Sequence, residues 1–430
     1  MDKVRIGIIG IGNMGTGHVR NLMQGLIPRM ELAAVADLRA DRRAWAKENL
    51  PESVRIYEEG ADLIAKDDCD AVLIAVPHYF HPEFAMAAFQ AGKHVMCEKP
   101  AGVYTKQVRE MNEAAEKSGL VFGMMFNQRT DCIYRKMREI VQSGELGAIK
   151  RVNWIITDWY RTDAYYDSGA WRATWAGEGG GVLLNQCPHN LDLLQWICGL
   201  PTKVSAFCHE GRWHDIEVED DVTAYLEFGS TEDGKPAATG VFVTTTGDAP
   251  GTNRFEITMD GGKLVCEDRK LRLWKNAVGE REFCHTAKDG FAKPECEVID
   301  IETDGLNEQH VGVLKAFTGR ILDGTPLIAE GTEGIRGLTL SNAIHLSGWL
   351  GRPVILPADP KSSGKAELPG GEASDPAGSG QGGSQNCCGA AGAILFDEDL
   401  FLEELNKRRA VSRIKTGESV TFDTEGSYGT

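Results

Sequence analysis

Short apolar runs alternate with amphipathic stretches through the first third of the chain. The runs are rich in Val, Ile and Ala, as the buried strands of a parallel sheet are. They lie at Val4–Ile9, 32–36, 71–76 and His94–Cys97. The stretches between them predict helices at 15–24, 39–48, 60–66 and 82–91. Strict alternation of strand and helix predicts βαβ units, which form a doubly wound parallel sheet.

The pattern changes after about residue 122. A helix is expected at Pro188–Cys198, because a proline suits a first helical turn and Gly199 and Pro201 follow its end. Strand-like runs punctuated by glycine then extend over 204–273, namely 222–228, 240–246, 254–259 and 263–266. Further helices are expected at 135–142, 308–322 and 332–346. This part is therefore expected to be α+β, with a large, open, mostly antiparallel sheet.

Four regions follow from these patterns. Residues 1–123 form the first domain, and residues 124–357 form the α+β domain. Residues 358–395 are dense in Gly, Ser and Pro, which indicates a flexible insertion or linker. Its adjacent Cys387 and Cys388 are a metal or redox site in one interpretation, and exposed thiols in a loose segment in the preferred one. Residues 396–430 contain a helix at 397–411 with basic residues near its end, predicted to be a docked appendage.

Composition narrows the possible partners. The formal net charge of the 430 residues is −17, which disfavours nucleic acid and an anionic membrane surface as partners. No run reaches the ~18 apolar residues that span a bilayer. The first residues resemble no secretory segment, and the eleven cysteines include no Cys-x-x-Cys pair. Together these features predict reduced thiols and a cytoplasmic location.

The first predicted strand runs directly into a glycine-rich turn. Its sequence is G-x-G-x-x-G, formed by Gly10, Gly12 and Gly15, and a predicted helix begins there. In a dinucleotide-binding turn the first glycine permits the tight bend and the second lets the backbone approach a pyrophosphate. The third allows close packing of helix on strand, and the helix amino terminus offers free N–H groups to phosphate. The context predicts a Rossmann domain.

Asp37 ends the second predicted strand, 22 residues after Gly15. A carboxylate at this place accepts hydrogen bonds from the ribose hydroxyls of a dinucleotide and repels a 2′-phosphate. NAD is therefore expected as the cofactor. NADP stays as the less favoured alternative, because Arg39 and Arg42 lie close by.

Two further stretches carry residues capable of proton chemistry. Glu98 and Lys99 follow the strand His94–Cys97, and ligands of a doubly wound sheet bind outside the carboxyl ends of its strands. A lysine there can donate a proton to a reacting hydroxyl or accept one from it. In the second stretch, residues 179–181 are three glycines, and His189 and Asp192 share a face of the helix that follows. Asn185 precedes that helix and can reach the same pocket.

The glycine-rich turn, the Glu-Lys-Pro tripeptide and the run Gly-Gly-Gly…Asn-x-x-x-His-x-x-Asp together resemble the glucose–fructose oxidoreductase / inositol dehydrogenase / MocA family. The resemblance spans about residues 4–357. It implies a set of residues that bind the dinucleotide. Besides Gly10, Gly12, Asp37 and Lys99, these are Ile11, Asn13, Met14, Val76, Pro77, His78, His81, Glu98, Asn127, Trp171 and Arg172.

The resemblance also implies a reaction. Lys99 and His189 would be catalytic, handling the hydroxyl proton while hydride passes between a substrate carbon and the cofactor. The implied substrate-binding residues are Asn185, Asp192, Tyr160, Trp171 and His310, and no metal site is implied. Dehydrogenases of the family often have Asp where this chain has Asn185. Asn185 can hold a hydroxyl but cannot act as a base, so the proton chemistry would depend on His189 and Lys99.

The favoured hypothesis is NAD-dependent oxidation of a secondary hydroxyl of a sugar, glycoside or polyol, with C3 of a glycoside as one attractive position. One alternative is redox-neutral cleavage of a glycoside with NAD retained. Another is a non-catalytic regulator that binds the dinucleotide, against which the presence of Lys99 and His189 argues. The resemblance further implies a homodimer or homotetramer, paired through the open face of the second sheet.

Overall fold

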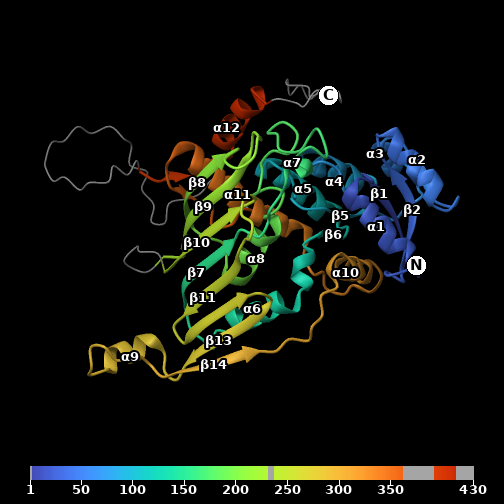
Figure 1. Cartoon of the computed structure of the whole chain (residues 1–430). Coiled ribbons are helices and arrows are strands. Elements are labelled where there is room, and N and C mark those ends of the chain that lie inside the picture. The colour runs from blue at the N-terminus through green and yellow to red at the C-terminus, as the bar shows by residue number, and fades with distance from the viewer. Residues whose placement is uncertain (1, 231–236, 362–391, 413–430) are drawn as a thin grey trace.

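The computed structural model describes residues 2–230, 237–361 and 392–412. A Rossmann domain lies to the right in Figure 1 and a large twisted sheet lies to the left, with helices packed between them. This is the predicted combination of a doubly wound parallel sheet with an α+β domain. Cys387 and Cys388 lie outside the described residues.

The first sheet has six parallel strands in the order β3-β2-β1-β4-β5-β6. Its strands are β1 (Val4–Ile9), β2 (Met30–Ala36), β3 (Arg55–Tyr57), β4 (Ala71–Ile74), β5 (His94–Cys97) and β6 (Phe122–Met124). Its helices are α1 (Asn13–Met23), α2 (Ala40–Asn49), α3 (Gly60–Ala65), α4 (His81–Gln90) and α5 (Thr105–Ser118), with the 3-10 turn η1 (His78–Phe80) before α4. Every residue of β4 is buried because helices cover both faces of the sheet.

The second sheet has ten strands among the described residues, in the order β14-β13-β12-β11-β7-β10-β9-β8-β15-β16. They are β7 (Ile149–Ile156), β8 (Lys203–Glu210), β9 (Glu219–Phe228), β10 (Ala238–Thr245), β11 (Asn253–Met259), β12 (Gly262–Glu267), β13 (Lys270–Asn276), β14 (Cys296–Ile301), β15 (Val354–Ile355) and β16 (Ile394–Leu395). The pairs β7–β10 and β15–β16 are parallel, and the other pairs are antiparallel.

One face of this sheet carries helices, and the other is open (Figure 1). In β9, Val222, Ala224 and Leu226 point to the covered face and are buried, whereas Thr223 and Tyr225 are exposed. This period of two is expected for a sheet with one buried face. The remaining elements of the second domain are η2 (Asn127–Thr130), α6 (Cys132–Gln142), α7 (Asp163–Tyr166), α8 (Pro188–Cys198), α9 (Glu280–Thr286), α10 (Gln309–Asp323), η3 (Gly331–Glu333) and α11 (Gly334–Leu350).

Helix α10 belongs to the second half of the chain but covers the first sheet. Val313, Leu314 and Phe317 are buried in one hydrophobic cluster with Ile6 and Ile8 of β1. Apolar spacing predicts this helix correctly, since spacing shows which face is buried. Spacing does not show which sheet receives that face. The first domain is therefore completed by a segment that lies about 200 residues later in the chain.

The carboxyl boundary of the linker predicted at 358–395 is wrong, because a strand begins before residue 395. Ile394 and Leu395 form β16 and pair with β15 at the edge of the second sheet. The predicted terminal helix is present as α12 (Glu398–Ala410), and its side chains Phe401 and Leu405 are buried. Phe401 stacks on Trp349 of α11 with 5.5 Å between ring centroids. Residues 362–391 and 413–430 lie outside the described residues.

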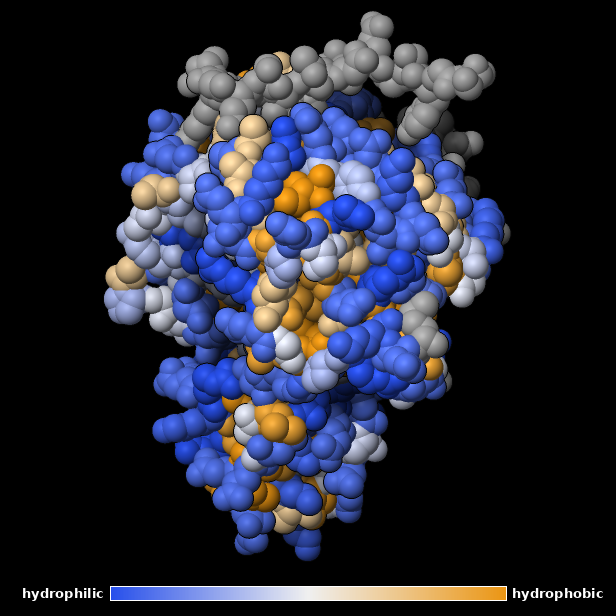
Figure 2. All heavy atoms as spheres, turned by 90° about the vertical axis from the view of Figure 1, so that its right-hand side faces the viewer, coloured by the Kyte–Doolittle hydropathy of each residue, from blue (hydrophilic) through white to orange (hydrophobic). Residues whose placement is uncertain are grey.

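The described surface is largely hydrophilic on the side of the Rossmann domain, with apolar residues gathered near the middle of that face (Figure 2). In the described ranges, no helix is long and apolar enough to cross a membrane.

Candidate active site

The three glycines of the turn after β1 have three different surroundings. Gly10 has φ +87°, and a Cβ there would lie 2.6 Å from the carbonyl oxygen of Ala75. A Cβ on Gly15 would lie 1.9 Å from the carbonyl oxygen of Gly10. The fold itself therefore requires glycine at positions 10 and 15.

Gly12 is different, because the fold does not require a glycine there. Its φ of −65° suits any residue, and a Cβ would meet no described atom within 4 Å. Gly12, Asn13 and Met14 are exposed, and α1 begins there with no side-chain cap and no acidic residue in its first turn. Open space before uncapped N–H groups is what a pyrophosphate needs.

Asp37 is positioned by the same turn. Its two carboxylate oxygens accept hydrogen bonds from the backbone N–H groups of Ile11 and Arg39, each at 2.9 Å. Carboxylate oxygens have further lone pairs, so ribose hydroxyls can still be accepted. Arg39 pairs with Asp41, and Arg42 donates to the carbonyl oxygen of Ile11 at 2.8 Å.

The loop after β4 borders the same side of the sheet. Val76 and Pro77 are partly exposed, as a cofactor contact requires, whereas His78 and His81 are buried. His81 places its ring nitrogens 2.6 Å and 2.8 Å from the carbonyl oxygens of Pro100 and Val76. It therefore ties this loop to the segment that carries Lys99. Because both ring nitrogens of His81 lie at hydrogen-bond distance from backbone carbonyl oxygens, the structure does not favour the expected contact of His81 with the cofactor.

Lys99, Asn185 and His189 are partly exposed within stretches that are otherwise almost entirely buried. Lys99 follows β5 of the first domain, and the other two residues flank the start of α8 in the second. Lys99 Nζ donates a hydrogen bond to the backbone carbonyl oxygen of Asn185 at 2.8 Å. The structure thus brings together the residues that the sequence singles out for proton chemistry.

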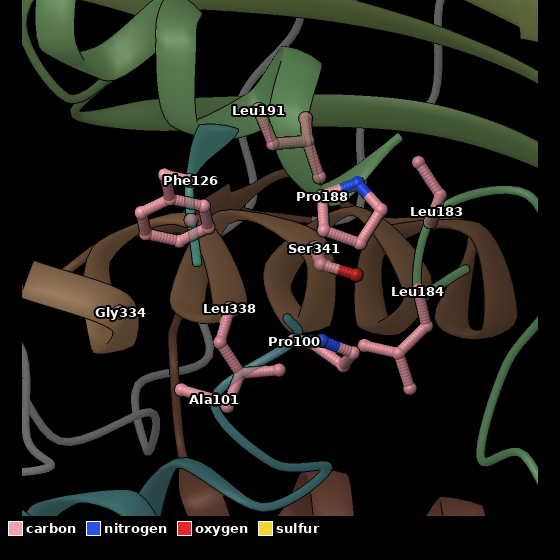
Figure 3. A pocket seen from close by; sticks show the side chains of 11 residues that line it. Pro100, Ala101, Phe126, Leu183, Leu184, Pro188, Leu191, Gly334, Leu338 and Ser341 are labelled. Carbon is pink, nitrogen blue, oxygen red and sulfur yellow. The ribbon is translucent and has the colours of Figure 1, made fainter. Parts of the chain in front are cut away.

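Apolar neighbours hold these residues in place. Pro100, Leu184 and Pro188 each stand next to one of them in the chain, and all three point toward α11 (Figure 3). Leu338 and Ser341 of α11 line the same small cavity. Each polar residue is therefore fixed by an adjacent residue packed on one helix.

The protonation of two groups is shifted. Burial, reinforced by the positive charge of Lys99, lowers the pKa of His189 to about 3. Its Nδ1 has no hydrogen-bond partner among the described residues. Burial also lowers the pKa of Lys99, against the raising effect of Glu98 and Glu178. A neutral imidazole beside an amine of reduced proton affinity suits proton exchange with a hydroxyl.

Glu98 faces the dinucleotide side of the site. Its Oε1 lies 2.6 Å from Nε2 of His18 in α1, and the ring of His310 lies edge-on to His18 at 5.3 Å. Burial would raise the pKa of Glu98, but the hydrogen bond and charge of His18 outweigh burial and lower it to about 2. His310 therefore packs on His18 close to Glu98.

Asp192 has a different environment from the one expected. It forms two hydrogen bonds with Arg129, at 2.6 and 2.7 Å, and the side chains are 1% and 2% exposed. Gln195 donates to the same carboxylate at 3.0 Å. Arg129 also pairs with Glu333. Because this carboxylate is buried and paired, Asp192 holds η2 against α8, and the geometry does not favour the expected substrate contact.

The aromatic residues near Asn185 also differ from expectation. Tyr160 is 48% exposed, and no contact joins it to Lys99, Asn185 or His189 among the described residues. Tyr165, rather than Tyr160, lies next to Asn185. Its hydroxyl is 3.3 Å from Nδ2 of Asn185 and 2.9 Å from Nη1 of Arg172. Arg172 lies over the ring of Trp171 at 4.6 Å, and Trp171 is edge-on to His78 at 5.7 Å.

Sequence reasoning missed Tyr165 and Glu178 as site residues. Tyr165 lies in a stretch with several aromatic residues, and the sequence alone does not show which of them contacts Asn185. Glu178 directly precedes the three glycines, and a carboxyl group beside a segment that must be buried was an available signal.

The residues present fit a dinucleotide. Gly12 and the uncapped start of α1 offer a phosphate site, and Asp37 offers a ribose acceptor. Asn127 donates through Nδ2 to Gln309, while its buried Oδ1 has no partner among the described residues and can serve a ligand. No group of three His, Cys, Asp or Glu residues suited to a metal ion occurs in the ranges the structure describes.

The glycines give a matched pair of variants. Gly15→Ala is expected to destabilise the fold by about 3 kcal/mol or more, because its Cβ would overlap the Gly10 carbonyl. Gly12→Ala is expected to change stability by only about 1 kcal/mol. It should weaken NAD binding about tenfold or more, since its methyl group would occupy the open space. Thermal unfolding and calorimetric titration with NAD measure both, and unchanged NAD affinity in Gly12→Ala would contradict the assignment of this turn.

Comparisons with known proteins agree with the geometry. Residues 4–126 match the model described as oxidoreductase family, NAD-binding Rossmann fold, and residues 134–265 match that of the GFO/IDH/MocA C-terminal domain. Myo-inositol 2-dehydrogenase of Thermotoga maritima is 32% identical over 350 residues, which cover 80% of this chain and 96% of that protein.

Two solved structures share the fold. WlbA dehydrogenase from Bordetella pertussis, in complex with NADH and UDP-GlcNAcA, has a TM-score of 0.70 at 24% identity, covering 84% of this chain and 99% of that one. Levoglucosan dehydrogenase, in complex with NADH and L-sorbose, has a TM-score of 0.67 at 20% identity, covering 83% and 99%. The domain matches and the extended similarity to the inositol dehydrogenase show that the chain belongs to the GFO/IDH/MocA family of oxidoreductases, with an NAD-binding Rossmann domain.

Proposed function

We propose that this oxidoreductase transfers hydride between NAD and a secondary hydroxyl of a sugar, glycoside or polyol. The observation that carries the proposal is the meeting of Lys99, Asn185 and His189 beside the dinucleotide site. The relatives support the substrate class, because their names refer to an inositol, a nucleotide sugar and levoglucosan.

The chain's own residues would handle the proton. Nicotinamide supplies the hydride acceptor or donor when it is bound. During oxidation the hydroxyl proton must go to a base within about 3 Å of the oxygen. Lys99, whose pKa is lowered by burial, can accept this proton, and neutral His189 can accept a hydrogen bond from the same hydroxyl. Asn185 can orient the hydroxyl but cannot take the proton.

The remaining pocket suits a sugar. Trp171 and Tyr165 offer aromatic faces, and Arg172 lies over both rings at 4.6 and 4.7 Å. Aromatic faces pack on the C–H surfaces of a sugar ring, while neighbouring polar groups bind its hydroxyls. We keep Trp171 as the proposed substrate contact and place Tyr165 in the role that the sequence assigned to Tyr160.

A panel of sugars, glycosides and polyols, followed by absorbance of NADH, tests the reaction. Lys99→Ala is expected to lower turnover at least about 100-fold, because it removes the proton acceptor, with NAD affinity changed less than about threefold. Lys106→Ala, on the exposed side of α5, is the control and should retain full activity. Glycoside cleavage without net NADH would instead support the redox-neutral reaction. Tight NAD binding with no turnover of any compound would support the regulator.

Asp37 is proposed to set the preference for NAD over NADP. Asp37→Ala is expected to raise the KM for NAD about tenfold and to reduce the discrimination against NADP, because the carboxylate no longer repels a 2′-phosphate. Asp62→Ala, which removes an exposed carboxylate of α3, is the control. Steady-state kinetics with both cofactors measure the ratio. An unchanged ratio in Asp37→Ala would count against this role.

We propose that the open face of the second sheet pairs two copies of the chain. Phe207, 71% exposed, stands on this face with Tyr225 and Ile155. Register places Phe207 opposite Thr223 and Val243 opposite Ile155, so apolar side chains extend across several strands. An exposed apolar patch of this kind supports the proposed pairing.

Light scattering after gel filtration tests this pairing. The chain is expected to have at least the mass of a dimer, and Phe207→Asp with Ile155→Asp is expected to reduce it toward one copy. Both side chains point away from the core, so the unfolding temperature of the variant should stay close to that of the parent. A parent chain with the mass of a single copy would refute the pairing.

A further inference from the structure

Glu178 is a buried carboxyl group directly behind the residues proposed to handle the proton. Its side chain is 3% exposed. Oε2 accepts a hydrogen bond from the backbone N–H of Ala173 at 2.6 Å, and Oε1 accepts one from Nδ2 of Asn185. A carboxyl group buried with so few donors is costly to the fold, and such groups gather at functional sites.

The backbone around Glu178 is held from several sides. Ala173 has φ +58°, a left-handed conformation that non-glycine residues rarely adopt, and its N–H points to the carboxylate. The N–H of Glu178 donates to Thr174 at 2.9 Å, and its carbonyl oxygen lies 3.0 Å from Nδ1 of His78. The carboxyl group therefore has a defined position relative to Asn185.

Asn185 connects Glu178 to Lys99. Its backbone carbonyl oxygen accepts from Lys99 Nζ, and its side-chain nitrogen faces both the Glu178 carboxylate and the Tyr165 hydroxyl. Because a carboxylate oxygen can only accept, it is the amide nitrogen that must face Glu178. The amide oxygen of Asn185 is thereby left to face a ligand.

We propose that Glu178 is a positioning residue of the proton-transfer centre, which fixes the amide of Asn185 and supplies the negative charge that stabilises protonated Lys99. This inference rests on the proposed function, since it concerns the proton of the same reaction.

The charged and titratable groups that face Glu178 come from every neighbouring segment. Arg172, whose Nη1 is 3.9 Å from Oε1, is positive, and Lys99 after β5 is positive when it is protonated. Glu219 of β9 is negative. His78 and Tyr165 are the other titratable neighbours. Burial is the largest effect and raises the pKa of Glu178 to about 7, against the lowering effects of Ala173 N–H, Arg172 and Asn185.

The sign of the pH dependence follows from these effects. Above about pH 7 Glu178 is ionised, and its negative charge stabilises the ammonium that forms when neutral Lys99 takes the hydroxyl proton. Below that pH Glu178 is neutral and this support is lost. Oxidation should therefore become faster as pH rises through about 7.

Glu178→Gln removes the charge and nearly keeps the shape. We expect kcat for oxidation to fall about tenfold or more, with KM changed less, and the rise of kcat near pH 7 to disappear. Glu227→Gln, which removes a carboxylate paired with Lys203 on the second sheet, is the matched control and should keep the parental profile. A folded Glu178→Gln variant with the parental pH profile would overturn the proposal.

The double variant Glu178→Gln with Asn185→Asp separates charge from structure. It places a carboxylate at position 185, on the other side of the hydrogen bond between residues 178 and 185. Its kcat is expected to be at least about tenfold higher than that of Glu178→Gln alone. A purely structural Glu178 would show no such recovery, and its absence in a folded double variant would overturn the proposed charge effect.

Infrared titration of the full chain without cofactor tests the carboxyl group independently of substrate and of any variant's activity. A protonated-carboxyl band should be present at pH 6, lost by pH 8, and absent from Glu178→Gln. The same band in both proteins, or no band in the parent, would overturn the assignment of Glu178. A failure of the substrate panel with this band intact would refute the proposed reaction alone.

Discussion

The candidate site depends on one carboxylate that is buried in the second domain. Glu219 of β9 is fully buried, and its oxygens accept the N–H groups of Gly181 and Leu183 at 2.9 and 3.0 Å. His345 of α11 places Nε2 3.1 Å from the same carboxylate. A buried carboxylate must be satisfied by donors, so it fixes the backbone that supplies them. That backbone is the turn that leads into Asn185 and α8. A Cβ on Gly181 would lie 2.0 Å from the backbone oxygen of Glu219, so only glycine fits there.

The residues proposed to handle the proton meet only because the two domains pack together. Lys99 belongs to the parallel sheet, and Asn185 and His189 belong to the segment that Glu219 holds. Two features keep the domains together: α10 completes the first domain, and Asn342 of α11 donates to the carbonyl oxygen of Val103 at 3.0 Å. Within the second domain, Arg129 joins the Asp192 and Glu333 carboxylates. Burial alone would lower the pKa of Arg129, but these two carboxylates outweigh it and raise that pKa. The arginine is therefore a permanent charge inside the second domain.

Local patterns predicted what is encoded locally. The alternation of strands and helices, the bend at Gly10, the close packing at Gly15 and the place of Asp37 at the end of β2 can each be read from a short stretch of the sequence. What the sequence could not show depends on partners distant in the chain. Asp192 lies on the expected helix face, but its partner Arg129 is 63 residues away. The spacing of apolar residues likewise predicted helix α10 but not the sheet on which it packs. The strand β16 was assigned to the predicted linker, because its partner β15 lies about 40 residues earlier. Tyr160 and Tyr165 are equivalent by composition, and only the folded chain distinguishes them.

In the proposed reaction, a substrate hydroxyl lies between Lys99 and His189 while its carbon faces the cofactor. A crystal structure of the full chain with NAD and a turned-over sugar or polyol tests this claim most directly. One hydroxyl oxygen is expected within about 3 Å of both Lys99 Nζ and a ring nitrogen of His189. The C–H bond of that carbon is expected to be directed at C4 of nicotinamide, with Oδ1 of Asn185 on a substrate hydroxyl. A substrate bound with neither Lys99 nor His189 at a hydroxyl beside the nicotinamide would contradict this claim.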